Sequence, residues 1–350
     1  MNKKLIAAAA LLLALSLMLC ACSRDASYIA ELDGKRIPIS DYSLKMFTAF
    51  STAKGKTGET ASDAEVILAH DIDGVPAEKW IEDETLRLLR EQLAVDAEFD
   101  RLELTLPDEA SAKADSNAEK QWERYSDVYN KNGVTEDSVR ESCRSSLKPK
   151  YIFEALYGAD GERALTTDEI AAFFDADYKL FRIIGIAKRD EDGEKLGEKE
   201  LEEQRERAVD YMDRIRAGEN ADALVAQAEE ELCELAGSEL DHEHGSELQS
   251  HISIVENGEL LYSVDIMEFI EQMSPGEVAL YEDDEDYYFV LQKLSAADSE
   301  ELIENNRLAV SYELRLDEFN EYLDSLTDAV ELELNGYAVE CYRPELFVLD

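Results

Sequence analysis

The chain carries few side chains suited to acid–base or metal chemistry. Its four histidines are His70, His242, His244 and His251. His242 and His244 are two residues apart in a charged turn, so in extended backbone they would point to the same side, as two metal ligands could. No third ligand with suitable spacing is evident, and we expect no metal. Because the sequence also shows no Ser–His–Asp arrangement, phosphate-binding loop or glycine-rich cofactor motif, we expect no cofactor.

Cysteine is the other reactive side chain. Cys143, Cys233 and Cys341 are far apart, odd in number and not arranged as Cys-x-x-Cys. This spacing predicts no disulfide framework, although one disulfide remains an alternative in an exported protein. We expect three mostly free, partly buried thiols. The remaining two, Cys20 and Cys22, lie together near the N-terminus.

The first 21 residues have the pattern of an export signal. A positive start at Lys3 and Lys4 precedes an almost wholly apolar run over 5–19, which is too short to span a bilayer. The run ends in Leu19-Cys-Ala-Cys22, which resembles the lipobox of bacterial lipoproteins. This resemblance implies cleavage after residue 21 and a lipid on Cys22, with an ordinary signal peptide as the alternative. Two or three acyl chains would anchor the protein stably.

The exported chain is strongly acidic. The formal net charge is −46 over 350 residues, and residues 1–21 contain only Lys3 and Lys4 as charged side chains. A surface of this charge repels nucleic acid and anionic lipid head groups, so nucleic-acid binding is excluded as a function class. The same charge could attract basic segments of a polypeptide client, or it could reflect general composition alone.

Hydrophobic periodicity predicts an ordered series of helices and strands. Alternation around Asp33-Gly34 predicts a β-hairpin over 28–37. A helix should follow Pro38, and a loop is expected over 51–63. A polar stretch is expected over 107–117. The remaining expected helices span 76–102, 118–157 in one or two pieces, 166 onward, 200–217, 221–231, 266–273 and 299–326. The remaining expected strands span 180–187, part of 252–262, 278–281, 287–294 and 330–334.

Several of these pieces resemble the exported parvulin-type foldases of the PrsA and SurA group. The matching stretches are 30–40 with the opening hairpin, 80–102 with the next helix, 165–174 with the lead-in to the isomerase module, and 215–220, 274–278 and 287–291 inside that module. Each motif is weak alone, but six occur in the family's order. The resemblance covers nearly the whole exported chain.

The resemblance implies an α+β fold in which a helical chaperone domain is built from both ends of the chain. A parvulin-like α/β module would be inserted between them. The implied divisions are a signal peptide over 1–21, the first part of the helical domain over 22–164, the module over 165–296 and the closing helix and strand over 297–350. In this arrangement a strand near residue 30 would pair with one near 332. The last helix would pack on the 76–102 helix.

The resemblance also indicates where catalysis should lie. The family has two histidines at the base of an apolar cup that receives the proline ring, and the positions aligned with them are Gly185 and Phe289. Neither side chain makes the hydrogen bonds of an imidazole, so no catalytic residue is carried over. The apolar residues expected near the cup, each of which could equally be plain core, are Phe181, Leu260, Phe269, Met273 and Phe289.

Three functions follow as hypotheses. The first is a lipid-anchored chaperone or foldase on the outer face of the cytoplasmic membrane that binds unfolded exported polypeptides in an apolar cleft of the helical domain. The second is an active peptidyl-prolyl isomerase with a degenerate site. The third is a structural lipoprotein. An apolar cleft favours the first, and a polar cluster inside the cup favours the second.

Overall fold

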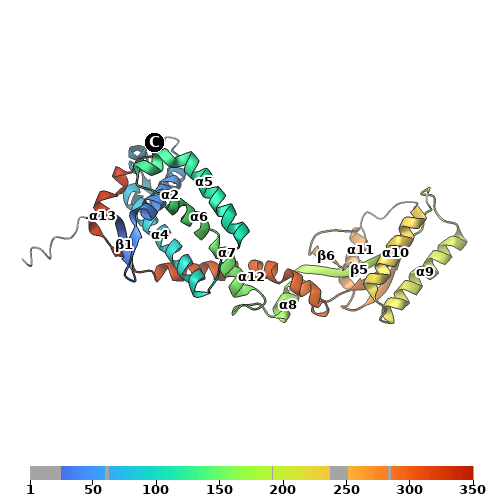
Figure 1. Cartoon of the computed structure of the whole chain (residues 1–350). Helices are drawn as coiled ribbons and strands as arrows, with labels where there is room; N and C mark the ends of the chain where they lie inside the picture. Colours follow the sequence, from blue (N-terminus) through green and yellow to red (C-terminus); the bar gives the residue numbers. More distant parts are fainter. Residues whose placement is uncertain (1–24, 60–62, 191, 237–250, 283–284, 350) are drawn as a thin grey trace, which may run out of the picture. The chain divides into compact units, whose positions relative to one another are not determined.

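The structure is a computed structural model that describes residues 25–59, 63–190, 192–236, 251–282 and 285–349 (Figure 1). Contacts divide the chain into two compact units, residues 1–156 with 315–350 and residues 157–314. We call them the helical unit and the module. The helical unit is built from both ends of the chain, as expected. The dividing points fall inside helices α7 (Lys148–Tyr157) and α12 (Glu300–Asp328), whereas the predicted module boundaries are 165 and 296. The α+β fold class is confirmed.

The helical unit consists of helices around a small three-stranded sheet. The helices, two of which continue into the module, are α2 (Ile39–Thr57), α3 (Ala64–Leu68), α4 (Ala77–Arg101), α5 (Asp108–Lys131), α6 (Glu136–Ser145), α7 (Lys148–Tyr157), α12 (Glu300–Asp328), α13 (Gly336–Cys341) and the 3₁₀ turn η2 (Pro344–Leu346). The strands are β1 (Tyr28–Leu32), β2 (Lys35–Pro38), β3 (Asp71–Ile72), β4 (Val75–Pro76) and β9 (Glu333–Leu334).

Distant segments close the helical unit. The sheet order is β2-β1-β9, and antiparallel β9 pairs Leu334 with Ala30. In α12 the hydroxyl of Tyr322 donates to Glu98 of α4 over 2.6 Å, and the Phe319 ring meets Phe153 edge-on at 5.2 Å. The predicted strand pairing and helix packing are thus both present. Such contacts between distant parts of the chain form slowly, because each requires a long loop to close.

Helices occupy part of the predicted loop over 51–63 and nearly all of the polar stretch over 107–117. Helix α2 runs through 51–57, because Ala49, Phe50 and Ala53 continue the buried stripe. It ends at Gly58, which adopts φ 72°. Helix α5 begins at Asp108, where its polar surface hides a narrow stripe formed by the buried Ala114 and Ala118. The polar composition was the wrong guide here, since a helix needs only one apolar face.

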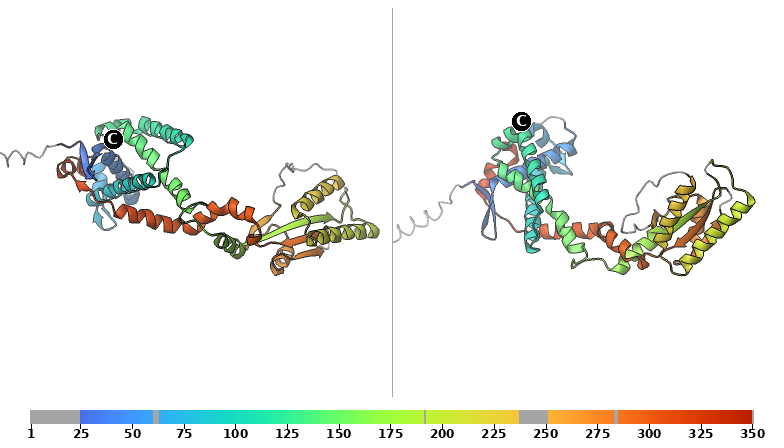
Figure 2. Two further views of the ribbon diagram at one scale, coloured as in Figure 1. Left: turned by 60° about the horizontal axis from the view of Figure 1, so that its bottom comes forward. Right: turned by 45° about the vertical axis from the view of Figure 1, so that its right-hand side comes forward.

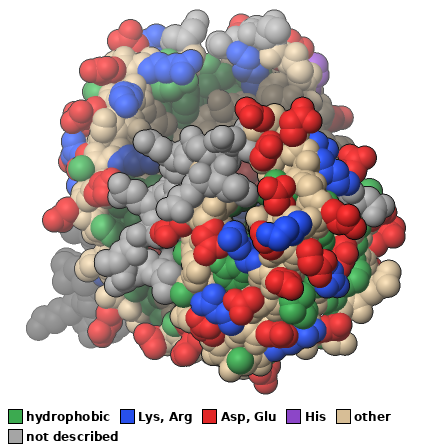
Figure 3. All heavy atoms as spheres, turned by 90° about the vertical axis from the view of Figure 1, so that its right-hand side faces the viewer, with side chains coloured by type: hydrophobic (Ala, Val, Ile, Leu, Met, Phe, Trp, Pro, Cys, Tyr) green, Lys and Arg blue, Asp and Glu red, His purple; other side chains and the backbone are tan. Residues whose placement is uncertain are grey.

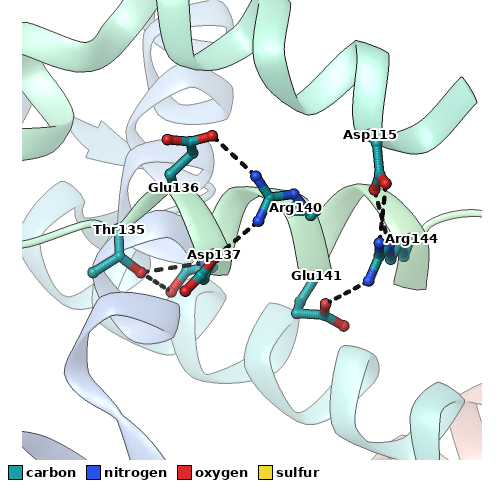
Figure 4. A network of polar contacts seen from close by, with 8 residues as sticks. Asp115, Thr135, Glu136, Asp137, Arg140, Glu141 and Arg144 are labelled. Atoms are coloured by element: carbon teal, nitrogen blue, oxygen red, sulfur yellow. Dashed lines mark hydrogen bonds and ion pairs between the residues drawn. The ribbon is translucent and has the colours of Figure 1, made fainter. Parts of the chain in front are cut away.

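Ion pairs fasten α6 to α5. Thr135 caps α6 by accepting from the backbone N–H of Ser138. Arg144 makes two hydrogen bonds to Asp115 of α5, at 2.9 and 3.0 Å, and Arg140 binds two acidic residues of its own helix (Figure 4). These side chains are at least partly exposed, so we expect each pair to contribute little, about 0–1 kcal/mol.

The module is a four-stranded antiparallel sheet with helices on both faces (Figures 1 and 2). Its elements are α8 (Thr167–Asp177), β5 (Tyr178–Ala187), α9 (Glu198–Arg216), α10 (Ala221–Ala236), β6 (Ser253–Glu256), α11 (Val264–Gln272), β7 (Val278–Glu282), β8 (Tyr287–Lys293) and the 3₁₀ turn η1 (Ala296–Asp298), followed by the first part of α12. The strand order is β6-β5-β8-β7. Helix α8 begins with a capping box in which Thr166 and Glu169 exchange hydrogen bonds.

No described helix is long and apolar enough to cross a membrane. Cys143, Cys233 and Cys341 form no disulfide and are partly buried, as predicted. The signal segment, the lipobox with Cys22, and His242 and His244 lie outside the described residues.

Candidate functional site

Strand alternation gives the module's sheet two different faces. On one face Ile184, Ile186, Tyr288 and Val290 are buried under α9 and α10. On the other face Phe181 and Leu291 are buried under α11. Even-numbered and odd-numbered residues of β5 and β8 therefore point to opposite faces and belong to different hydrophobic cores. The second face holds Gly185 and Phe289, the two positions that the resemblance aligns with the family's histidines.

Gly185 and Phe289 lie directly opposite each other in the β5–β8 ladder. The structure thus brings together the two positions that match the family's histidines. A Cβ atom added to Gly185 would lie 3.5 Å from the rings of both Phe289 and Tyr287. These two rings are 5.3 Å apart and lie beside the place where a side chain on residue 185 would begin. The base of the site is therefore aromatic rather than polar.

Four of the five predicted cup residues belong to one apolar group. Phe181, Phe269, Met273 and Phe289 pack together with residues that the sequence reasoning missed. We call the following set the aromatic cluster: Phe181, Tyr262, Phe269, Met273, Tyr281 and Phe289. Phe181 and Met273 are buried, and the other four are only partly buried. Part of the cluster is therefore core and part is accessible surface.

Tyr262 joins the cluster from the loop before α11. Its ring centroid is 6.1 Å from that of Phe181 and 6.2 Å from that of Phe289, both edge-on. Leu260, the fifth predicted cup residue, lies outside the cluster with 60% of its surface exposed. The loop turns the alternate residue inward, so Tyr262 holds the place that we expected for Leu260. Its aromatic character, next to two leucines, was the signal available in the sequence.

One polar group of residues lies at the edge of the aromatic cluster. Burial raises the pKa of the Tyr262 hydroxyl, and the carboxylate of Glu229 adds to this effect. Glu229 approaches Nε2 of His251 at 3.4 Å, and the His251 side chain is only 12% exposed. Sequence reasoning gave His251 no role. None of these three side chains lies on β5 or β8.

The other face of the sheet carries a structural ion pair. Arg182 of β5 binds both oxygens of Asp222 at 2.7 and 2.9 Å, and the backbone N–H of His251 donates to the same carboxylate. Burial acts to raise the pKa of Asp222, but these hydrogen bonds outweigh it and lower the pKa. The pair fixes the start of α10 against β5.

Among the clefts in the described part of the helical unit, two bear on binding. One has a volume of about 310 Å³, and polar atoms make up the larger part of its exposed lining. It is lined by Ser51, Lys54 and Arg124 together with six apolar residues: Phe47, Phe50, Ile67, Tyr125, Val128 and Leu349. The other, of about 280 Å³, has polar residues such as Lys45, Gln92 and Ser142 in its lining, but apolar atoms make up the larger part of its exposed lining. Lys45 donates to Ser142 over 3.1 Å, and burial lowers the pKa of its ammonium group although nearby carboxylates oppose the shift.

No metal centre is seen in the part of the chain that the structure describes, where no group of three or more His, Cys, Asp or Glu side chains is placed to hold an ion. The described module surface is strongly mixed in charge. In the space-filling view acidic side chains spread over the visible face, with basic side chains and apolar patches between them (Figure 3).

Comparison with protein-family models and with curated protein sequences finds no match. Comparison with solved structures finds several foldases. The foldase protein PrsA of Lactococcus lactis is 11% identical, with 91% of this chain and 98% of that chain covered and a TM-score of 0.30. PrsA of Bacillus subtilis is 11% identical over the same shares with a TM-score of 0.27, and the peptidylprolyl isomerase PrsA of Bacillus cereus is 15% identical over 77% and 92% with a TM-score of 0.26.

Proposed function

We propose that this protein is a lipid-anchored extracytoplasmic folding factor that holds unfolded exported polypeptides. The observation that carries the proposal is the aromatic cluster at the place where the resembling family carries its histidine pair. Gly185 and Phe289 face each other there, and partly buried rings offer apolar contact instead of proton transfer.

Binding of an unfolded chain needs accessible apolar surface but no reactive group. Tyr262, Phe269, Tyr281 and Phe289 are each partly exposed, so a client side chain that covers them removes further apolar area from water. Each Å² covered contributes about 25 cal/mol before the cost of ordering the client. Aromatic side chains suit this role because they offer a large area with few rotatable bonds.

The helical unit adds a second surface for the same task. Its cleft of about 310 Å³ has Phe47 and Tyr125 in its lining, with ring centroids 5.1 Å apart. Lys54 and Arg124 at this cleft are basic groups in an otherwise acidic protein. An apolar side chain of a client would contact the two rings.

Placement outside the cytoplasm rests on the N-terminal sequence. The apolar run and the Leu19-Cys-Ala-Cys22 motif support export and a lipid on Cys22. An anchor would keep a holding protein where exported chains emerge.

A client-aggregation assay tests the proposal. Residues 23–350, which retain both units, are added to a chemically unfolded client, and light scattering follows its aggregation after dilution. We expect the wild type to slow aggregation and the double variant Tyr262→Ala/Phe289→Ala to lose at least about half of that effect. Tyr337→Ala, a change of an exposed tyrosine in the helical unit, is the control and should behave as wild type. A wild type without effect, or equal loss in the control, would contradict the proposal.

A second candidate function is peptidyl-prolyl isomerisation by groups other than the family's pair. The observation that favours it is the set of Tyr262, Glu229 and His251 at the cluster's edge. The hydroxyl of the partly buried Tyr262, near the carboxylate of Glu229, could donate to a prolyl amide, which would ease rotation about that bond.

A further inference from the structure

A separate groove lies in the module away from the aromatic cluster. It has a volume of about 270 Å³ and lies between α8, the start of β5, β6 and α12. We call it the α8–α12 groove. Its lining residues are Phe173, Phe174, Tyr178, Ile254, Asn306, Ala309, Val310 and Glu313. The four from α12 are spaced three and four apart, so a single face of that helix forms one wall.

Three aromatic rings form the opposite wall. The centroids of Phe173, Phe174 and Tyr178 are 5.4 to 5.6 Å from one another. Phe174 is buried, whereas Phe173 and Tyr178 are partly exposed. Ile254 is 42% exposed beside them. An accessible group of rings of this kind can receive a flat or cationic side chain.

Carboxylates surround this wall. Burial raises the pKa of the Tyr178 hydroxyl, and the negative charges of Glu256, Glu313, Asp177 and Glu259 raise it further. Glu256 lies directly opposite Tyr178 in the β5–β6 ladder. Four acidic groups therefore act on one aromatic position from three separate elements and a loop.

The nearby basic side chains have partners elsewhere, and none of the described lining residues is basic. Arg307 on α12 donates to the backbone carbonyl of Leu165 and pairs with Glu304, both at 2.5 Å. Lys179 donates to Asn257 over 3.1 Å. In the wall, Nδ2 of Asn306 donates to the Leu302 carbonyl over 2.8 Å, which leaves Oδ1 as its acceptor. The groove thus offers acceptors, negative charge and aromatic faces together.

We propose that the α8–α12 groove binds an arginine side chain of an extended polypeptide. A guanidinium group is flat, stacks on aromatic rings and donates to carboxylates in a fixed geometry, and these are the properties that the groove complements. The apolar residues next to that arginine would lie on Ile254 and Val310. The inference rests on the proposed function for the source of the polypeptide. It gives the clients a chemical preference, namely arginine beside apolar residues.

Peptide binding tests this proposal. The probe is the fluorescein-labelled peptide Ala-Leu-Arg-Leu-Ala, compared with the same peptide carrying glutamine or lysine at the centre, by fluorescence anisotropy with residues 23–350. We expect the arginine peptide to bind about tenfold more tightly than the glutamine peptide. The variant Glu256→Gln/Glu313→Gln should remove most of this preference, because it removes two of the negative charges that act on Tyr178. Both carboxylates are exposed, so we expect the variant to keep its fold.

A matched control separates the groove from the general charge of the protein. Glu206→Gln/Glu230→Gln removes two equally exposed carboxylates from α9 and α10 and should keep the preference. Ala309→Phe fills the groove at an exposed position of α12 and should weaken binding of the arginine peptide without any change in charge. Equal binding of the arginine and glutamine peptides, equal loss in the two double variants, or equal binding of the lysine peptide would overturn the proposal.

Failure of this inference differs from failure of the proposed function. If the groove does not select arginine, the wild type still slows client aggregation through the aromatic cluster. If the protein holds no client, the arginine preference of the short peptides is still measurable.

Discussion

The helical unit and the module's aromatic cluster treat polar groups in opposite ways. In the helical unit the buried carboxylate of Glu98 accepts from Arg101 at 2.6 and 2.7 Å and from the hydroxyl of Tyr322 at 2.6 Å. In the cluster the two central positions hold Gly185 and Phe289. The chain therefore buries a fully hydrogen-bonded carboxylate in the helical unit but has no polar side chain at the two central positions of the cluster.

This difference indicates distinct roles. A satisfied buried polar network favours one arrangement of its helices, because any other arrangement leaves a group unpaired. An apolar cluster with partly exposed rings makes no such demand and can accept varied partners. We therefore expect loss of a buried hydrogen bond to lower the stability of the helical unit. We expect loss of exposed apolar area to weaken binding by the cluster.

The largest expected effect is on the helical unit's core. Phe153 is fully buried and packs on Phe319, so Phe153→Ala should cost that unit about 3–5 kcal/mol of unfolding free energy. Both tryptophans, Trp80 and Trp122, lie in this unit, so tryptophan fluorescence in denaturant follows it alone. Phe181→Ala in the module should leave this transition in place. If Phe181→Ala shifted it as far, the two units would unfold as one.

A smaller loss should follow from Glu98→Gln. The change keeps the shape but weakens the hydrogen bonds from Tyr322 and Arg101, at an expected cost of about 1–3 kcal/mol in the same fluorescence measurement. Asp83→Asn on the same helix α4 breaks an exposed pair with Lys79 and should cost less than about 0.5 kcal/mol. Equal costs for the two variants would mean that the buried hydrogen bonds of Glu98 stabilise the unit no more than an exposed ion pair does.

The cluster should accept the missing imidazoles. Gly185 has no positive φ, and a Cβ there makes only ordinary contacts at 3.5 Å, so Gly185→His/Phe289→His should fold. We expect at least about a tenfold gain in prolyl-isomerisation rate over wild type, a modest share of what a positioned acid–base pair can contribute. Each single variant serves as control and should gain less. A folded double variant without any gain would show that the cluster does not present a proline to these positions.

The smallest effect is a pH dependence in the helical unit. Burial raises the pKa of Asp41 above 3.8, although hydrogen bonding to Ser138 opposes the shift. The folded state therefore favours the protonated form, and the stability contributed by Asp41 is full below 3.8 and lost as pH rises through the raised pKa. Asp41→Asn cannot ionise, so its stability relative to wild type should increase as the pH rises above 3.8 and should level off above the raised pKa, in a series of denaturation midpoints that starts at about pH 4. A constant difference in denaturation midpoint across this range would contradict the shift.

The order of elements was predictable from sequence because periodicity and turn signals are local. The hairpin at Asp33-Gly34, the capping box at Thr166 and the β-branched run of β5 each specify their own structure. The helical continuation over 51–57 was not predictable from composition, since its burial depends on neighbours distant in the chain.

The site was predictable only in part for the same reason. Strand register places Gly185 opposite Phe289. This pair could be predicted because both positions align with motifs that occur in the order of the resembling family. Tyr262 and His251 lie in loops, where no period fixes which side chain turns inward. The carboxylates around Tyr178 come from several elements, so their convergence appears only in the folded chain.

The central claim is that the aromatic cluster binds polypeptide without the chemistry of the histidine pair. A prolyl-isomerisation assay on short X–Pro peptides with residues 23–350, run beside the client-aggregation assay, tests it most directly. We expect no acceleration over the uncatalysed rate from a folded protein that still slows aggregation. A clear acceleration by the wild type would contradict it and would direct attention to Tyr262, Glu229 and His251.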